Sequence, residues 1–376
     1  MSDAPPAGRR WPRRVTLGLA LLLAAALAGE IVCRVLVALD PPDDADAPLD
    51  GPRVSDPGRR VGILDMLRAS ADDRIVFALK PHLDQVPFKE APVSTNRFGF
   101  RGPEIDVGEG PDTVTIVGLG DSILFGYGVP DGADCLSVLE RRLRQRYPQK
   151  DWRCINTGVP DYNTVMEVAT LRAKGLRFGP DLVVLFLAPN DLGLPPYVRV
   201  DDDVLDLRRC FLFERLARGT SWVPDHNGFP MLSGRDPHLL ARKSDVGRAT
   251  TLPALYDALQ GWDAAAAALH ELDGLSHEHG FQVATLSLIE DAVSRRLANT
   301  GQALGWTNVR VLPDIQRYLR EHGGGSWDPD HPEAYLASAL AVSPGDGHPS
   351  ALLDSMAADR LLAELEESGV LQRLME

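Results

Sequence analysis

The sequence predicts a three-layer α/β/α fold with a mostly parallel sheet, preceded by one N-terminal membrane helix. Short apolar runs rich in Val, Ile and Leu, such as 113–117 and 181–187, indicate buried strands. Segments with helical spacing alternate with these runs, as in proteins whose parallel sheet is covered by helices on both faces. Residues 15–39 are apolar except for Thr16, Glu30 and Arg34. This apolar segment is long enough to cross a bilayer.

The alternating elements can be placed in order along the chain. Strands are expected at 113–117, about 153–156, 181–187, 281–288 and 308–312. Helices are expected at about 134–147, 163–176, 254–279 and 350–368. The interval from about 192 to 251 has no sustained periodicity, and we interpret it as an insertion that serves either as a substrate-binding lid or as a mobile surface loop.

The charge distribution around the apolar segment predicts how the chain is organised. Residues 1–14 carry Arg9, Arg10, Arg13 and Arg14 and are expected to form a cytoplasmic basic tail. Residues 15–39 then form a transmembrane anchor; the alternative is a signal peptide cleaved after the Ala26-Leu27-Ala28 stretch. Residues 40–92 form a spacer and lead-in, and 93–376 form the main domain, which is expected outside the cytoplasm, in the periplasm or its equivalent.

Composition excludes several classes of function. The 376-residue chain carries a formal net charge of −14, which argues against nucleic acid as a partner because phosphate binding depends on clustered Lys and Arg. Four cysteines are too few for a disulfide scaffold. Neither a Cys/His cluster with zinc spacing nor a phosphate-binding glycine loop is present in the sequence. The sequence therefore predicts no metal and no cofactor.

A candidate nucleophile follows the strand expected at 113–117. Gly120-Asp121-Ser122 stands at the carboxyl end of that strand, where open α/β sheets bind their ligands. Gly120 would allow a tight turn with unusual backbone angles and a close approach of substrate. Asp121 is expected to be a support residue that caps the following turn. The alternative is that Asp121 and Ser122 only cap a helix and carry no chemistry.

Three later segments favour the chemical interpretation. They are Asn156-Thr157-Gly158, Ala188-Pro189-Asn190-Asp191 and Asp346-Gly347-His348-Pro349-Ser350. Together with Gly120-Asp121-Ser122 they resemble the four blocks of the SGNH (GDSL-type) hydrolase family. Residues 94–102 resemble the lead-in of its membrane-anchored bacterial members. The resemblance implies a flavodoxin-like SGNH hydrolase fold, a nucleophilic Ser122, a basic His348, and an oxyanion hole formed by Ser122, Gly158 and Asn190.

The acid that orients the histidine departs from the family pattern. The family commonly places an Asp three residues before the His, but that position is Gly345, and the nearest acid is Asp346. Either Asp346 orients His348 with altered geometry or a backbone carbonyl does so. Asp328 and His331 form an alternative acid/base pair with the usual spacing. We favour His348, because Ser350 and the apolar spacing after it predict a long closing helix that would fix this histidine at the sheet edge.

The predicted function is a serine esterase that acts outside the cytoplasm on acyl, in particular acetyl, esters of a small molecule or polysaccharide. An O-acyltransferase acting on an envelope polysaccharide would use the same site. A carbohydrate-binding or scaffold protein without catalytic activity is the third alternative, because a fold does not by itself imply an activity. Arg101 could bind an anionic group of the substrate or tie the lead-in to the domain, and we expect the second.

Overall fold

The computed structural model describes residues 13–39, 61–199, 205, 210–217, 240–242 and 254–376, apart from positions 71, 109, 111, 196, 323, 324, 329 and 330. The described residues belong to two compact units. The larger unit contains the sheet and the candidate site, and the smaller one contains the N-terminal helix and part of the insertion. Residues 40–60 of the expected spacer and lead-in, and most of the insertion, lie outside the described residues.

A five-stranded parallel sheet forms the centre of the larger unit. Its strands are β5 (Thr113–Leu119), β6 (Asp151–Asn156), β7 (Leu182–Leu187), β10 (Gln282–Ser287) and β11 (Thr307–Arg310). They lie in the order β11-β10-β7-β5-β6, with Gly118 opposite Val184 in the β5–β7 pair. This is the flavodoxin-like strand order, in which the connections reverse direction beside the first strand. Ligands of such sheets bind at the carboxyl ends of the strands at this reversal, here between β5 and β7.

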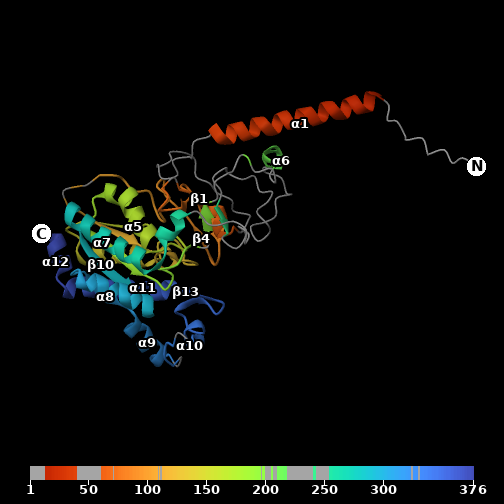
Figure 1. The fold of residues 1–376 in the computed structure, drawn as a ribbon. Coiled ribbons are helices and arrows are strands. Elements are labelled where there is room, and N and C mark those ends of the chain that lie inside the picture. The colour runs from red at the N-terminus through yellow and green to blue at the C-terminus, as the bar shows by residue number, and fades with distance from the viewer. Residues whose placement is uncertain are drawn as a thin grey trace, which may run out of the picture. The chain divides into compact units, whose positions relative to one another are not determined.

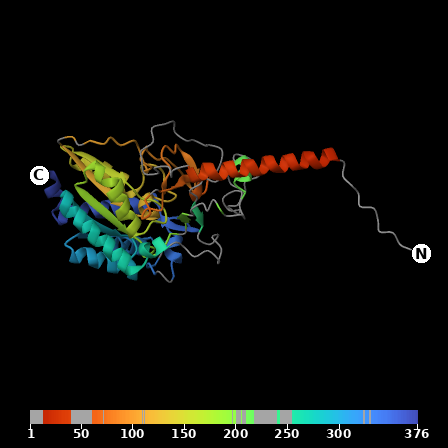
Figure 2. The ribbon, with the colours of Figure 1, turned by 45° about the horizontal axis from the view of Figure 1, so that its top comes forward.

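Helices cover both faces of the sheet (Figure 1). On one face, α4 (Cys135–Arg146) packs against α11 (Ala351–Glu367); on the other, α5 (Thr164–Ala173) packs against α7 (Gly261–His279), and α7 contacts α8 (Ala292–Ala303). Alternate strand residues point to each face: Ile116 and Val184 belong to the core beneath α4 and α11. Figure 2 shows the same layers from a second direction. The three-layer α/β/α prediction is confirmed.

The elements predicted for the sheet and its covering helices are observed close to their expected positions, with some differences. The helix expected at 254–279 is a 3-10 turn, Ala254–Leu259, followed by α7, and a second 3-10 turn, Gly175–Phe178, follows α5. Helix α8 was not expected, although two parallel strands such as β10 and β11 need a crossover between them. Its N-cap is Asp291, whose side chain accepts the Ser294 N–H at 2.8 Å.

Residues 61–93 of the lead-in form short hairpins. Strand β1 (Leu67–Ala69) pairs with β2 (Phe77–Leu79), and β3 (Val86–Phe88) pairs with β4 (Ala91–Val93). Helix α2 (Ile63–Met66) precedes them. Their apolar side chains are buried; Phe77 and Phe88 are at most 2% exposed. This part of the lead-in is therefore packed into the domain.

The remaining elements are short. Helix α3 (Ser122–Phe125) follows β5. Nearer the C-terminus lie α9 (Leu312–Glu321), α10 (Glu333–Leu336), the paired strands β12 (Ala341–Ser343) and β13 (Asp346–Pro349), and α12 (Val370–Met375). The described parts of the insertion are β8 (Tyr197–Arg199), α6 (Phe211–Ala217) and β9 (Leu240–Arg242).

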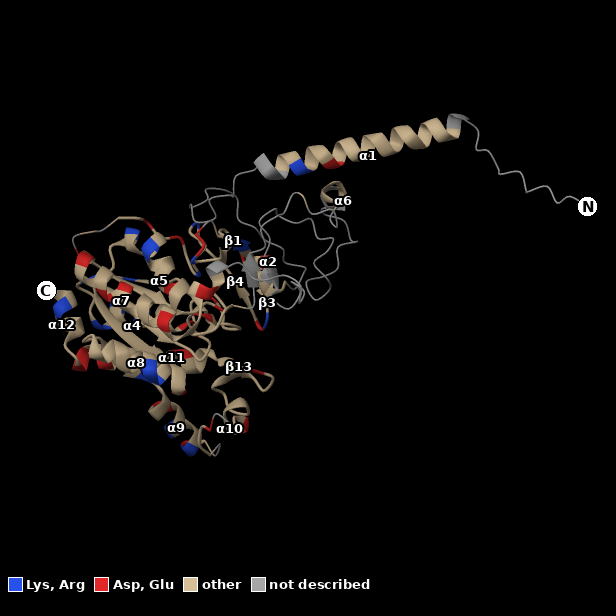
Figure 3. Cartoon of the chain, viewed as in Figure 1, with Lys and Arg blue, Asp and Glu red and all other residues tan. Residues whose placement is uncertain are grey.

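The smaller unit contains α1 (Arg13–Leu39). Its segment Val15–Leu36 spans 22 residues with a mean hydropathy of 2.2, and none of its most apolar window is buried against protein. At 1.5 Å per residue the segment is about 33 Å long, close to the thickness of a bilayer core. Figure 3 shows that charged residues are almost absent along α1. By length and composition, this helix is suited to cross a membrane.

Candidate active site

Ser122 lies at the reversal point of the sheet. It is the first residue of α3 and is separated from the end of β5 by Gly120 and Asp121. The first N–H groups of a helix have no acceptor within the helix. Asp121 is the N-cap of this helix, and its carboxylate accepts the Ile123 N–H at 2.9 Å. The cap fixes the turn that presents the Ser122 hydroxyl at the edge of the sheet.

Gly120 is required for space, not for its backbone angles. Its φ is not positive, contrary to the expected unusual conformation. A Cβ at this position would lie 2.6 Å from the Cβ of Leu124 and 3.0 Å from that of Phe186. A side chain here would push α3 away from β7, so glycine keeps the nucleophile turn close to the sheet.

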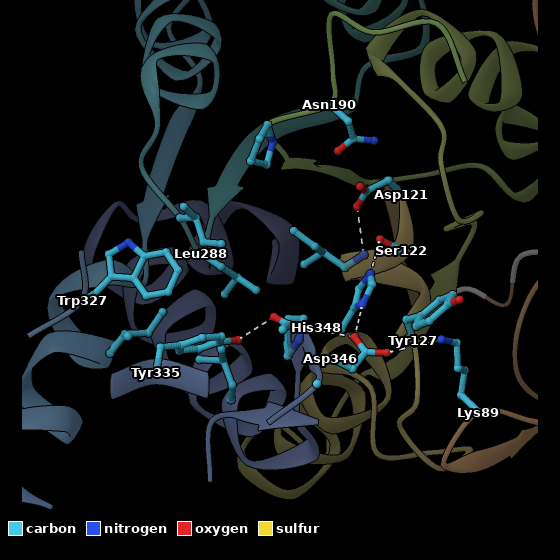
Figure 4. Close-up of a pocket in the computed structure, with 18 residues that line it drawn as sticks. Lys89, Asp121, Ser122, Tyr127, Asn190, Leu288, Trp327, Tyr335, Asp346 and His348 are labelled. Atoms are coloured by element: carbon cyan, nitrogen blue, oxygen red, sulfur yellow. Dashed lines mark hydrogen bonds and ion pairs between the residues drawn. The ribbon is translucent and has the colours of Figure 1, made fainter. Parts of the chain in front are cut away.

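His348 and Asp346 meet Ser122 in a continuous hydrogen-bonded chain. His348 Nε2 lies 2.9 Å from Ser122 Oγ, and His348 Nδ1 lies 2.5 Å from Asp346 Oδ1 (Figure 4). The two-residue spacing works because both residues belong to β13, where side chains two apart point to the same side. A carboxylate three residues earlier is not needed for this geometry.

The surroundings of Asp346 keep it ionised. Burial alone would raise the pKa of Asp346, but hydrogen bonds from the side chain and backbone N–H of His348, together with the charge of Lys89, lower it. An ionised carboxylate at Nδ1 fixes the imidazole tautomer that leaves Nε2 free to accept the serine proton. The arrangement has the geometry of a nucleophile, a base and an orienting acid.

The alternative pair lies elsewhere. The His331 N–H donates to the backbone carbonyl of Asp328 at 3.1 Å, and the His331 side chain is exposed. Neither residue lines the cavity that contains Ser122. The structure therefore brings His348 and Asp346, and not His331 and Asp328, to the candidate nucleophile.

The expected oxyanion donors are held by their neighbours. The Gly158 N–H donates to Asn156 Oδ1 at 3.0 Å, and a Cβ on Gly158 would lie 2.5 Å from the Phe125 nitrogen. Asn190 Nδ2 donates to the Tyr162 carbonyl at 3.0 Å, and Asn190 lines the cavity. Both residues follow strands that flank Ser122, but their action on an oxyanion stays a prediction.

Two residues near the triad were not foreseen from the sequence. The Tyr127 ring stacks on the His348 imidazole with centroids 4.3 Å apart, and the Lys89 ammonium lies 5.1 Å from the centre of the Tyr127 ring. The Lys89 nitrogen is also 3.6 Å from Asp346 Oδ2. Burial, followed by the charge of Asp346, raises the pKa of Tyr127 to about 12. Tyr127 is therefore a neutral ring that holds the imidazole plane.

Asp161 is a third residue that the sequence did not reveal. It adopts a left-handed backbone with φ of +70°, which favours glycine. Burial raises its pKa to about 6, repulsion from Asp121 adds to the rise, and attraction to His348 opposes it. A strained acidic residue within electrostatic reach of the base is unusual outside functional sites.

Arg101 ties the lead-in to the segment after the nucleophile. Its buried guanidinium donates to the backbone carbonyls of Phe125, Gly126 and Val129 and lies 3.4 Å from Asp131 Oδ1. All of its carbonyl partners follow Ser122 closely in sequence. The expected structural role for Arg101 is confirmed, because both terminal nitrogens of the guanidinium donate to protein carbonyls.

A cavity of about 500 Å³ opens on Ser122, His348 and Asp346. Its lining includes Ser122, His348, Asn190 and Lys89, and it continues toward Leu288, Trp327 and Tyr335, all labelled in Figure 4. Among the residues that the structure describes, no group of three or more His, Cys, Asp and Glu could hold a metal ion.

Comparison with known proteins gives only remote likenesses. No protein-family model and no curated protein matches the sequence. Among solved structures, the chain is similar to LAE5, an α/β hydrolase enzyme from the metagenome of Lake Arreo, with 17% identity over 69% of this chain and 97% of LAE5 and a TM-score of 0.39.

Two further solved structures show likeness of the same degree. A variant of Axe2, an acetyl xylan esterase from Geobacillus stearothermophilus, is 15% identical over 69% of this chain and 97% of its own, with a TM-score of 0.39. TesA is 14% identical over 67% of this chain and 98% of its own, with a TM-score of 0.37. Likeness at this level does not decide the substrate or the roles of individual residues.

Proposed function

We propose that this protein is a serine esterase that hydrolyses acyl esters through an acyl-enzyme on Ser122. The observation that carries the proposal is the chain of contacts from Ser122 Oγ through His348 to Asp346, with distances of 2.9 and 2.5 Å. These three residues lie at the reversal point of a flavodoxin-like sheet, and a cavity opens beside them. The ordered blocks that resemble SGNH hydrolases contain the same residues.

The geometry supports a two-step reaction. His348 Nε2 accepts the proton of Ser122 Oγ as the oxygen attacks the ester carbonyl, and Asp346 stabilises the imidazolium that forms. The imidazolium then gives its proton to the departing alcohol, which leaves the acyl group on Ser122. A water molecule activated by His348 attacks the acyl-enzyme, releases the acid and restores the serine. The Ser122 N–H and the Asn190 amide would stabilise the oxyanion. The Gly158 N–H donates to Asn156 Oδ1 in this structure and would have to leave that acceptor to contribute.

The site is proposed to act outside the cytoplasm, in the periplasm or its equivalent. The basic residues before α1 favour a cytoplasmic N-terminus, so a helix that crosses the membrane would deliver the catalytic unit to the other side. Small-molecule or polysaccharide esters reach the enzyme there. If a sugar hydroxyl in place of water attacks the acyl-enzyme, the same site performs acyl transfer.

Fluorophosphonate labelling tests the proposed nucleophile and base. The full chain in detergent micelles should be labelled and should hydrolyse p-nitrophenyl esters, and Ser122→Ala should abolish both. His348→Ala should reduce hydrolysis by at least about 10³-fold, because the serine then has no base. His331→Ala is the matched control, since it removes an exposed imidazole outside the cavity, and it should retain full activity.

Two results would contradict the proposal. One is labelling that survives in Ser122→Ala, which would place the nucleophile elsewhere. The other is an inactive His331→Ala beside an active His348→Ala, which would transfer the base role to His331 and the acid role to Asp328.

A further inference from the structure

The cavity at Ser122 has one polar end and one apolar end. Lys89, Asp121, Asn190 and Asp346 lie around the catalytic serine. The other end, which we name the apolar chamber, is lined by six side chains: Leu288, Ile289, Ile315, Trp327, Tyr335 and Leu353. In Figure 4, Leu288, Trp327 and Tyr335 lie on one side of His348, and Tyr127 and Lys89 lie on the other. Among the residues that the structure describes, the side chains that line the chamber carry no charge.

The chamber is built into the fold. Leu288 follows β10, Ile315 belongs to α9 and Leu353 to α11, and each is at most 2% exposed. The Tyr335 hydroxyl donates to the carbonyl of Gly347, which lies between the proposed acid and base, at 3.1 Å. The Trp327 ring meets the Tyr335 ring edge-on at 4.9 Å. Its walls are thus anchored both in the core and on the catalytic strand.

An acetyl group would fill only a small part of this space. Its methyl group is about the size of a water molecule, whose share of liquid volume is about 30 Å³. The cavity measures about 500 Å³. If the chamber takes half of this volume and the ester and alcohol take the other half, the chamber holds about eight groups of methylene size at about 30 Å³ each. The buried aliphatic walls favour binding of an aliphatic acyl chain, because both apolar surfaces are then removed from water.

The chamber suits the acyl side of the ester better than the alcohol side. A sugar placed among these side chains would lose hydrogen bonds from its hydroxyl groups, which is unfavourable without buried polar partners. The alcohol also has to leave after the first step, and the polar, partly exposed end around Lys89 and Asn190 gives it a way out. An acyl chain, in contrast, stays attached to Ser122 until water arrives.

We propose that the apolar chamber binds the aliphatic chain of a medium-length acyl group, so that the substrates are esters of acids with about six to ten carbons. This inference rests on the proposed esterase function and specifies the acyl group. It replaces the acetyl preference expected from the sequence.

A chain-length series tests the chamber. The full chain in detergent micelles is assayed with p-nitrophenyl acetate, butyrate and octanoate, each corrected for its rate with hydroxide. We expect kcat/KM to rise from acetate to octanoate by about fourfold for each methylene that enters the chamber. Ile289→Trp places an indole in the partly exposed wall of the chamber and should lower the octanoate-to-acetate ratio at least tenfold.

Leu352→Trp is the matched control. It adds the same indole to α11 one residue before Leu353, at a side chain that is 40% exposed, and should leave the ratio unchanged. Thermal unfolding of both variants verifies that they are folded. An octanoate-to-acetate ratio of kcat/KM of one or less in the wild type would overturn the chamber assignment. So would a ratio that Ile289→Trp does not change. Absence of both fluorophosphonate labelling and hydrolysis of every ester would instead overturn the esterase function itself.

Discussion

Lys89 connects the lead-in to the catalytic acid. It occupies the two-residue turn between β3 and β4 with a φ of +52°, where glycine would be unstrained. Its ammonium lies 3.6 Å from Asp346 Oδ2, the oxygen that does not face His348. A strained lysine directed at the acid suggests a positioning role, since residues that break local backbone preferences concentrate at functional sites.

We predict that Lys89→Gly lowers kcat/KM by about two- to fivefold while the thermal unfolding midpoint stays level or rises. Glycine relieves the backbone strain, but it removes an ion pair that is partly exposed, and such pairs contribute about 1 kcal/mol or less. Lys89→Arg should retain activity. Because exposed charges are screened by salt, the difference between wild type and Lys89→Gly should shrink in about 1 M NaCl.

A salt-independent loss of activity in Lys89→Gly would contradict the electrostatic role. Loss of activity together with a lower unfolding midpoint in both variants would indicate a purely structural one.

Among the residues of the candidate site, the sequence predicted those that belong to a recognisable motif and missed those that do not. Ser122, His348 and Asp346 could be named because each belongs to an ordered block beside a predicted strand or helix. The sequence left open how Asp346 reaches His348, because the strand β13 that aligns them was not expected. Lys89 and Asp161 carry no pattern, and their proximity to the base depends on the folded lead-in and on a left-handed turn.

Helix α5 contains an ionisable group in the core of the larger unit. Glu167 is 1% exposed, and neither of its carboxylate oxygens has a hydrogen-bond partner among the described residues. Burial, followed by repulsion from the nearby Asp191, raises the pKa of Glu167 well above its usual value. The same burial raises the pKa of Asp191, which follows Asn190 at the rim of the site. Burial therefore favours the protonated form of Glu167 in the folded state.

We predict that stability falls as the pH rises and that Glu167→Gln removes part of this loss. A carboxyl whose folded pKa is raised contributes its full stability below the unfolded value of about 4.5, and the contribution is lost as the pH rises through the folded pKa. Each unit by which the folded pKa exceeds the unfolded pKa corresponds to about 1.4 kcal/mol of unfolding free energy that is lost at high pH. Glu167→Gln should therefore increase the free energy of unfolding at pH 8 by more than about 1 kcal/mol and change it little at pH 4.

Urea unfolding at pH 4 and pH 8 measures the free energy of unfolding of the wild type and of Glu167→Gln at each pH. Glu364→Gln serves as control, because it removes a carboxylate from the partly exposed side of a helix. Equal destabilisation of Glu167→Gln at both pH values would show that Glu167 is ionised and paired in the folded protein.

The elements themselves were predicted where the chain repeats one pattern over many residues. The five parallel strands and α4, α5, α7 and α11 fall close to their expected positions because apolar runs and helical spacing are long there. The hairpins at 67–93 were not expected, since each strand has three residues and such short strands show no periodicity. Helix α8 was missed although the crossover between β10 and β11 requires a connecting element.

Within the smaller unit, the polar pair of the membrane helix holds a segment of the insertion. Glu30 accepts the backbone N–H groups of Phe211 and Leu212 at 3.1 and 2.8 Å, at the start of α6. The Arg34 guanidinium lies 4.8 Å from the centre of the Phe211 ring and 2.8 Å from Glu30. A Cβ on Gly29 would come within 3.1 Å of Leu212. The two charged residues of the apolar segment are thus both engaged at its C-terminal end.

The proposed topology places this end of α1, and the insertion with it, outside the cytoplasm, and Cys210 provides a direct test. Cys210 is exposed, whereas Cys33 and Cys135 are buried and Cys154 is partly buried. Burial raises the pKa of Cys135 and Cys154 well above the usual value, which keeps them as unreactive thiols, because the thiolate is the nucleophile. A membrane-impermeant maleimide should therefore report on Cys210.

We predict that the impermeant maleimide labels the full chain in intact spheroplasts about as strongly as after lysis, and that Cys210→Ser removes the labelling. The reason is that basic residues before an apolar helix, here Arg9, Arg10, Arg13 and Arg14, favour a cytoplasmic N-terminus, which would place the residues after Leu39 on the other side of the membrane. Labelling that appears only after lysis would reverse the orientation. The intact mass of the purified protein separates anchor from signal peptide: a mass for residues 1–376 retains the helix, whereas loss of about 28 N-terminal residues would mean cleavage after Ala28.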